Sequence, residues 1–291
     1  MAATPLTATQ SRLAQTMSER LRQIVSGPDE DISLAEAALL IAGHGYPDLN
    51  VAAYLSRIEE LAYRLRLRIA EDETIPGRIS ALNQFLFGDL GFAPNSEDYY
   101  DPRNSFLNEV LERRTGIPLT LSVIYMELGR KIGLPLQGVS YPGHFLVKCA
   151  VPEGALVLDP YSGGISLGLQ DLQKRLREVR GGEVSRAIVA ELLVSASNKE
   201  IIVRLLRNLK AIYLRGHDLD KALPIMDWII ATMPEQTPEL RDRGMIYQEL
   251  ECPRAALADF EAYLDLLPGG EDTEDIRERI IELRKEAARL N

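Results

Sequence analysis

Two side chains in the middle of this sequence have the types and the setting of a catalytic pair. His144 lies in Tyr-Pro-Gly-His-Phe, and Asp159 follows in Leu-Asp-Pro. In triads of the cysteine type, a thiol at the start of a buried helix is activated by a histidine and an acid from adjacent strands. The segment Arg114–Ser122, which would begin that helix, holds Pro118 but no cysteine. The pattern therefore predicts a His–Asp site without its thiol.

Two hydroxyls and one distant thiol are the available substitutes for that nucleophile. Thr120 and Ser122 fall in the first turns of the predicted helix and could face the histidine, but a hydroxyl needs a well-placed base to react. Cys149 comes five positions after His144, and an odd offset on a regular strand sends two side chains to opposite faces. Catalysis by Ser122 or Thr120 with His144 and Asp159 therefore stays open as an alternative.

The elements around these residues form an α+β pattern. Pro118 suits the first position of a helix, and Gly133 with Pro135 beyond it ends that helix. Strand-like runs follow over 137–141, 144–149 and 155–158, which we expect to pair as antiparallel neighbours. From about Leu169 to the end the pattern is helical. We expect a small sheet confined to the middle third of the chain.

Helices and one long polar loop precede the site. Ser33 with Glu36 predicts a helix start, Asn50 predicts another, and a further helix is expected near 79–86. The loop over 95–104 is long enough to serve a function. The residues that we select as candidates for ligand binding are Asn104, Asn108, Glu109 and Tyr161.

The C-terminal part contains an internal repeat. Tyr213, Ala222, Met226 and Pro234 recur 34 positions later as Tyr247, Ala256, Phe260 and Pro268. That period is typical of tetratricopeptide helix pairs, in which small residues let helices approach and a proline follows the second helix. The last helix, after Thr273, is expected to cap the stack.

The segments Asn104–Pro118 and Tyr141–Phe145 resemble the SirB-type bacterial transglutaminase-like family over roughly residues 32–180. The resemblance implies a papain-like fold whose active members use a Cys-His-Asp triad for acyl transfer or proteolysis, and a tetratricopeptide tail. By position, His144 matches the histidine and Asp159 the aspartate, while the cysteine position falls near Pro118. Proline there also lacks an N–H for an oxyanion hole, a donor worth about 2.7–4 kcal/mol in the transition state.

Composition narrows the function classes. The net charge of −10 on 291 residues, with no long basic run, disfavours nucleic acid as a partner. No signal-like or membrane-spanning apolar run is present, so we expect a cytoplasmic protein. Two cysteines and three histidines give no metal-ligand spacing, and we expect neither a metal nor a cofactor.

These observations predict three segments: a helical or disordered lead-in over 1–31, a transglutaminase-like domain over 32–180, and tetratricopeptide-like helices over 196–291. The functional hypothesis is a non-catalytic module that binds a protein or peptide through its helical tail. A hydroxyl-dependent hydrolase or acyltransferase and a purely structural scaffold are the alternatives.

Overall fold

The computed structural model describes residues 7–152, 154–235, 237–270 and 272–289. The chain divides into two compact units, residues 1–205 and 206–291. The boundary falls within helix α9 (Asn198–Arg215). Each unit is described by itself below.

The first unit begins with helices that surround one buried helix. Its helical elements before the sheet are α1 (Ala8–Val25), η1 (Asp29–Asp31), α2 (Leu34–Ala42), α3 (Val51–Arg66), α4 (Ile75–Asn83), the π-helical η2 (Gln84–Asp89), η3 (Pro102–Asn104), α5 (Leu107–Arg113) and α6 (Pro118–Lys131). The side chains of Ser33 and Asn50 accept hydrogen bonds from the N–H groups of Glu36 and Ala53, which confirms both predicted helix starts. Helix α2 is buried at every residue except Glu36, and α6 is buried from Pro118 to Gly129, so neighbouring elements cover both helices on all sides.

Helix α6 is the centre of this unit. Every residue from Pro118 to Gly129 is buried, and Gly133 follows the helix with φ at 78°, as the predicted stop requires. The preceding Ile117 is the N-cap, so Pro118 occupies the first helical position. The predicted boundaries of this helix are confirmed.

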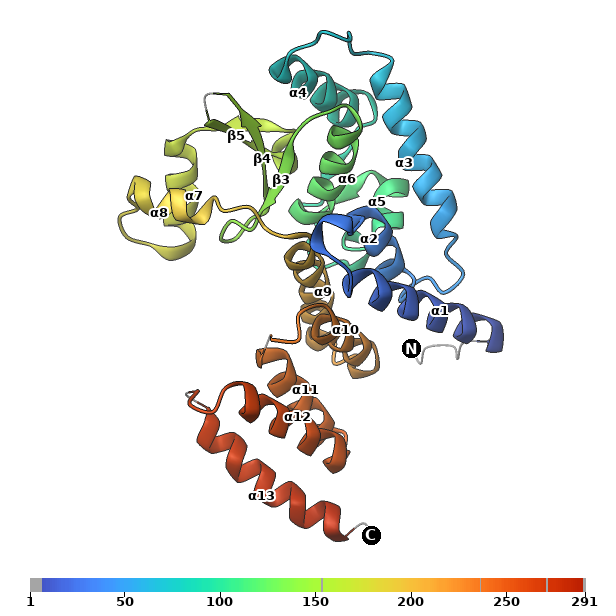
Figure 1. Ribbon diagram of the computed structural model, residues 1–291, viewed down its shortest axis with the longest axis vertical. Helices are drawn as coiled ribbons and strands as arrows, with labels where there is room; N and C mark the ends of the chain where they lie inside the picture. Colours follow the sequence, from blue (N-terminus) through green and yellow to red (C-terminus); the bar gives the residue numbers. More distant parts are fainter. Residues whose placement is uncertain (1–6, 153, 236, 271, 290–291) are drawn as a thin grey trace. The chain divides into compact units, whose positions relative to one another are not determined.

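A four-stranded antiparallel sheet packs on α6. Its strands, in the spatial order β3-β4-β5-β6, are β3 (Leu136–Val139), β4 (Leu146–Val151), β5 (Gly154–Asp159) and β6 (Ile165–Leu167). The opposite face carries a core made with α7 (Leu169–Arg180) and α8 (Arg186–Leu192), so the sheet lies between α6 and the α7–α8 pair (Figure 1). The strand predicted over 144–149 begins two residues later, since His144 lies in the preceding turn. A two-residue parallel pair, β1 (Ala93–Pro94) with β2 (Thr115–Gly116), joins the loop to the start of α6.

One edge of the sheet is covered by the chain itself. The N–H of Ala196 donates to the carbonyl oxygen of Gly138 on β3 at 2.8 Å, and Ser195 bonds the side chain of Gln137 at 2.8 Å. Nearby, Asp29 caps the first turn of α9 by accepting hydrogen bonds from the N–H groups of Asn198 and Lys199, each at 2.9 Å. The beginning of the chain is thereby fixed to the helix that leads out of this unit.

The second unit consists of helix pairs with the predicted period. Its remaining helices are α10 (Leu219–Thr232), α11 (Thr237–Glu249), α12 (Pro253–Leu266) and α13 (Thr273–Arg289). Helices α10 and α12 are offset by 34 positions at both ends, and Ala222 and Ala256 are fully buried. Trp228 is 5% exposed, which agrees with a packing role. None of the helices in the described part of the chain is long and apolar enough to cross a membrane.

We expect Glu127 on α6 to make the stability of the first unit depend on pH. Burial raises the pKa of this carboxyl, although Arg130 and the N–H of Ala35 act in the other direction. A group whose folded pKa is raised contributes stability at low pH and loses it as the pH rises through the folded pKa. We expect Glu127→Gln to make the first unit more stable than wild type at pH 7–8, with the difference vanishing near pH 4.

Urea unfolding at several pH values would test this expectation. Glu60→Gln, a change of the same charge at an exposed position of α3, is the control and should leave the pH slope nearly unchanged. An equal change of slope in both variants would contradict the assignment to Glu127.

Candidate functional site

Asp159 ends strand β5 and is fully buried. Its Oδ1 atom accepts from the backbone N–H of Tyr161 at 3.0 Å, and its Oδ2 atom accepts from the hydroxyl of Ser162 at 2.7 Å. The first bond is an Asx turn, which Asp before Pro favours. The carboxylate is therefore held rigidly by the turn that it starts.

His144 meets the same carboxylate. Its Nε2 atom lies 2.8 Å from Asp159 Oδ1, and its side chain is 16% exposed. Because an ionised carboxylate only accepts hydrogen bonds, Nε2 carries the proton in the neutral ring, and Nδ1 is then an acceptor. Across the described residues Nδ1 has no hydrogen-bond partner. The ring also makes an edge-to-face contact with Tyr161, with centroids 5.6 Å apart.

A cation shares the acid with the histidine. Arg175 on α7 places Nη2 2.6 Å from Asp159 Oδ2. Burial by itself would raise the pKa of Asp159, but the hydrogen bond and charge of His144, together with Ser162 and Arg175, hold it well below its usual range. The two carboxylate oxygens of Asp159 thus have different partners: Oδ1 bonds the imidazole of His144, and Oδ2 pairs with the guanidinium of Arg175.

The start of α6 is connected to His144 through other residues. The hydroxyl of Thr120 donates to the carbonyl oxygen of Asn104 at 2.8 Å, and the side chain of Asn95 donates to Asn104 Oδ1 at 3.0 Å. The hydroxyl of Tyr161 reaches the carbonyl oxygen of Asn95 at 3.4 Å. Thr120 therefore belongs to a network that fastens the loop over 95–104 beside the site.

Ser122 lies on α6, two residues after Thr120. Its side chain is fully buried, and its Oγ atom has no hydrogen-bond partner. Within the described chain, no hydrogen bond joins Ser122 or Thr120 to His144. The recorded contacts of the His144 ring are with Asp159 and Tyr161, from the strand end and its turn.

The remaining predicted binding residues have other surroundings. Asn104 is fully buried and donates to the carbonyl oxygen of Asp98 at 2.7 Å, so its side chain fastens the loop. Asn108 is 3% exposed with an unpartnered Oδ1, and Glu109 accepts a hydrogen bond from Tyr46, whose pKa burial and Glu109 raise to about 12. Among the four predicted binding residues, Tyr161 contacts His144 in the described part of the chain.

Three neighbours of the candidate site were not predicted. Ser162 follows Asp159 by three positions, and a serine in that place could have suggested a turn bond. Arg175 gives no local signal because a charged residue on an amphipathic helix usually faces water. Arg204 on α9 donates to the carbonyl oxygen of His144 at 2.7 Å across 60 positions of sequence.

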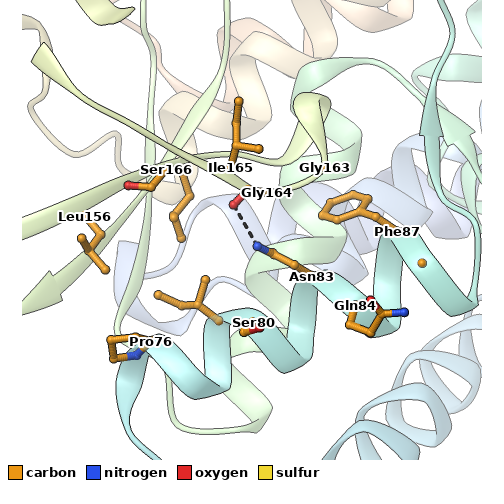
Figure 2. Close-up of a pocket in the computed structure, with 13 residues that line it drawn as sticks. Pro76, Ser80, Asn83, Gln84, Phe87, Leu156, Gly163, Gly164, Ile165 and Ser166 are labelled. Atoms are coloured by element: carbon orange, nitrogen blue, oxygen red, sulfur yellow. Dashed lines mark hydrogen bonds between the residues drawn. The ribbon is translucent and has the colours of Figure 1, made fainter. Parts of the chain in front are cut away.

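A pocket of about 540 Å³ lies nearby, between α4, η2 and the β5–β6 hairpin. Figure 2 shows the amide of Asn83 donating to the carbonyl oxygen of Gly164, at 2.9 Å, within this pocket. Asn83 Oδ1 in turn accepts from the hydroxyl of Tyr125 at 2.8 Å. Asn83 therefore connects α4 both to α6 and to the turn that follows Asp159.

The two glycines of that turn have the same backbone conformation but different surroundings, so their substitution tests the contact with Asn83. Gly163 and Gly164 have φ values of 73° and 76°, but a Cβ atom at Gly163 would meet open space while one at Gly164 would overlap Asn83. We expect Gly163→Ala to lower the free energy of unfolding by about 1 kcal/mol and Gly164→Ala by about 2–3 kcal/mol. Urea unfolding measures both, and equal losses would show that the contact with Asn83 is unimportant.

The described residues contain no group of three or more His, Cys, Asp or Glu side chains placed to hold a metal ion. Cys149 is buried on β4, where burial raises the pKa of its thiol, and its sulfur contacts the carbonyl oxygen of Ala150. It is not a partner of His144 in the described contacts. The site thus consists of the His–Asp–Arg cluster, Tyr161 and the loop over 95–104.

Comparison with known proteins gives two family matches. The model of the transglutaminase-like superfamily matches residues 52–207, and a tetratricopeptide-repeat model matches residues 209–280. A UPF0162 protein of Xylella fastidiosa is 41% identical over 89% of this chain and 92% of its own. A UPF0162 protein of Vibrio cholerae is 30% identical over 87% of this chain and 94% of its own.

Two further similarities are weaker. Protein SirB1 of Salmonella typhimurium is 28% identical over 81% of this chain and 86% of its own. A crystal structure of menin overlaps 93% of this chain and 74% of its own with a TM-score of 0.39 and 10% identity, which is too low to support any argument. The first family match covers more than half of the 291 residues. This chain therefore belongs to the transglutaminase-like superfamily, within the UPF0162 family of bacterial proteins, and carries a tetratricopeptide region after the family domain.

Proposed function

We propose that this protein is a non-catalytic member of its superfamily that binds a protein or peptide. The observation that carries the proposal is the start of α6. Pro118 occupies the first helical position, where it provides neither a nucleophile nor an N–H. The nearest hydroxyl, that of Thr120, is engaged with the carbonyl oxygen of Asn104.

The electrostatics of Asp159 support the same proposal. In a catalytic triad, the acid stabilises the imidazolium that forms when the histidine takes a proton. Here Arg175 lies 2.6 Å from the same carboxylate and offsets its charge, so less of that stabilisation is available to His144. The His–Asp pair then serves to shape a binding surface that includes Tyr161.

The tetratricopeptide region supports binding in a second way. Stacked helix pairs form extended surfaces that suit peptides and partner helices, and the described residues contain two such pairs followed by α13. Both parts of the chain are therefore candidates for contact with a protein partner.

The proposal is tested by capture of bacterial proteins on the immobilised full-length chain, followed by binding measurements with each purified candidate. We expect at least one saturable partner, with affinity reduced by His144→Gln or by substitutions in the tetratricopeptide helices. Arg12→Gln, at an exposed position of α1, is the control. Absence of any saturable partner would count against a binding module.

A hydrolase or acyltransferase that uses Ser122 or Thr120 with His144 and Asp159 is the second candidate. It is favoured by the 2.8 Å His–Asp hydrogen bond, which leaves Nδ1 as an acceptor, and by the unpartnered Oγ of Ser122. Ester hydrolysis and acyl transfer to an amine should then fall in His144→Ala while stability is unchanged. Hydrolysis or acyl transfer that is unchanged in His144→Ala would rule out this second candidate.

A further inference from the structure

Arg204 is a partly buried cation without an acidic partner. Its Nη2 atom donates to the carbonyl oxygen of His144, and its guanidinium lies over the ring of Phe145, 5.4 Å from the centroid. In the described residues it forms no ion pair. Burial lowers the pKa of Arg204, an effect that Tyr99 partly offsets, but an arginine keeps its charge in proteins.

Several other partly buried cations in the described residues have more partners than Arg204. Arg78 donates to three carbonyl oxygens, those of Glu73, Ile132 and Glu71, and others pair with acids. Lys210, 13% exposed, pairs with Glu239, and Arg243, 17% exposed, pairs with Asp259. Arg175, 26% exposed, pairs with Asp159. A charge taken out of water is stabilised by an opposite charge. Because Arg204 is partly buried without an acidic partner, its guanidinium indicates a site for the anionic group of a ligand.

Three residues near Arg204 could contribute to such a site: His144, Tyr161 and Tyr99. His144 contacts both Arg204, through its carbonyl oxygen, and the ring of Tyr161. The phenol of Tyr99 interacts electrostatically with Arg204 and with Tyr161, so it lies in the neighbourhood of both. Tyr99 is 45% exposed, so this group of residues reaches the surface of the molecule.

We propose that Arg204, Tyr99, His144 and Tyr161 form a site for a single carboxylate group, supplied by the C-terminus or an acidic side chain of a peptide. We call these four residues the carboxylate site. One unmatched cation suits a singly charged group better than a phosphate dianion, since Arg175 is already neutralised by Asp159. The planar fork of Arg204 and the phenol of Tyr99 supply hydrogen-bond donors to it. The two aromatic rings pack beside the adjoining peptide.

This inference rests on the proposed binding function, because it names the chemistry that the same region of the protein recognises. The probes are N-acetyl-alanine, with its free carboxylate, and its amide, titrated into the ¹⁵N-labelled full-length chain at constant ionic strength. The ring signals of His144, assigned by their loss in His144→Gln, report binding. We expect saturable shifts with the acid and none with the amide.

Two substitutions of Arg204 distinguish the contribution of its positive charge to binding from that of its planar guanidinium. Arg204→Gln should weaken binding of the acid at least tenfold, and Arg204→Lys should restore part of it. Arg12→Gln is the charge-matched control and should bind as wild type. A probe with an acidic side chain and an amidated C-terminus distinguishes the two sources of the carboxylate.

Three outcomes would overturn the inference: equal binding of acid and amide, an unchanged affinity in Arg204→Gln, or inorganic phosphate binding more tightly than the acid. Each of these leaves the proposed function standing if a captured partner still depends on His144. Conversely, specific binding of the acid with no saturable protein partner would support the carboxylate site and contradict the binding module.

Discussion

Asp159→Ala is expected to lower the free energy of unfolding of the first unit by about 3–5 kcal/mol. The fully buried carboxylate accepts hydrogen bonds from Tyr161 N–H and the Ser162 hydroxyl, and pairs with His144 and Arg175. Its removal leaves Arg175, 26% exposed, without its counter-charge and leaves the turn after β5 without its cap. Hydrogen exchange of α6 amides under increasing urea would measure this loss in the first unit separately from the second.

Two further variants show which interactions of Asp159 account for the loss of stability in Asp159→Ala. Ser162→Ala removes one of the donors and should cost about 1 kcal/mol. Asp159→Asn keeps the shape and removes the charge, so it should fall between the two. A loss in Asp159→Ala no larger than that in Ser162→Ala would contradict the central place given to this carboxylate.

The pH dependence of Asp159→Asn follows from the depressed pKa of Asp159. A group with a lowered folded pKa contributes stability above its unfolded pKa of about 3.9, and that stability is lost as the pH falls through the folded value. The difference between wild type and Asp159→Asn should therefore be largest at pH 5–7 and should shrink below about pH 4.

Phe260→Ala is expected to cost the second unit about 3–5 kcal/mol. The ring is fully buried among residues of α11, α12 and α13, and a Cβ built on Gly244 would lie 2.6 Å from it, so the ring rests directly on that backbone. Repeat arrays are stabilised by contacts between neighbouring helix pairs, and this unit has few of them to lose. Hydrogen exchange should therefore show α11–α13 opening while α6 remains protected.

Leu266→Ala on the same helix is the matched control. Its side chain is 50% exposed, so its loss should change stability by less than about 0.5 kcal/mol. Phe260→Leu should cost less than Phe260→Ala because most of the apolar volume is kept. Opening of α6 together with α11–α13 in Phe260→Ala would contradict separate unfolding of the two units.

The sequence predicted the elements whose signals are local. Pro118, Gly133 and Asn50 act within a few residues of themselves, and the helices that they start or end are confirmed. The 34-residue period repeats a packing pattern, and the helix pairs follow it. The small antiparallel sheet was predicted in the correct third of the chain.

Features that depend on distant contacts were missed. Strand β6 has three residues and follows two glycines, so it has no periodicity to detect. The π-helical η2 interrupts a pattern that reads as one continuous helix. At the site, Arg175 and Arg204 come from helices whose charged residues look like solvent-facing ones, and only the folded chain brings them to Asp159 and His144.

The cap that Asp29 places on α9 has a consequence for synthesis of the chain. Its two bonds span 169 and 170 positions, so the N-terminal helices cannot complete their contacts until residue 199 has left the ribosome. Until then the outer edge of β3 also lacks Ala196. A nascent or truncated chain that stops near residue 180 therefore exposes an unpaired strand edge, which is closed only after the first residues of the segment leading into the tetratricopeptide region have emerged.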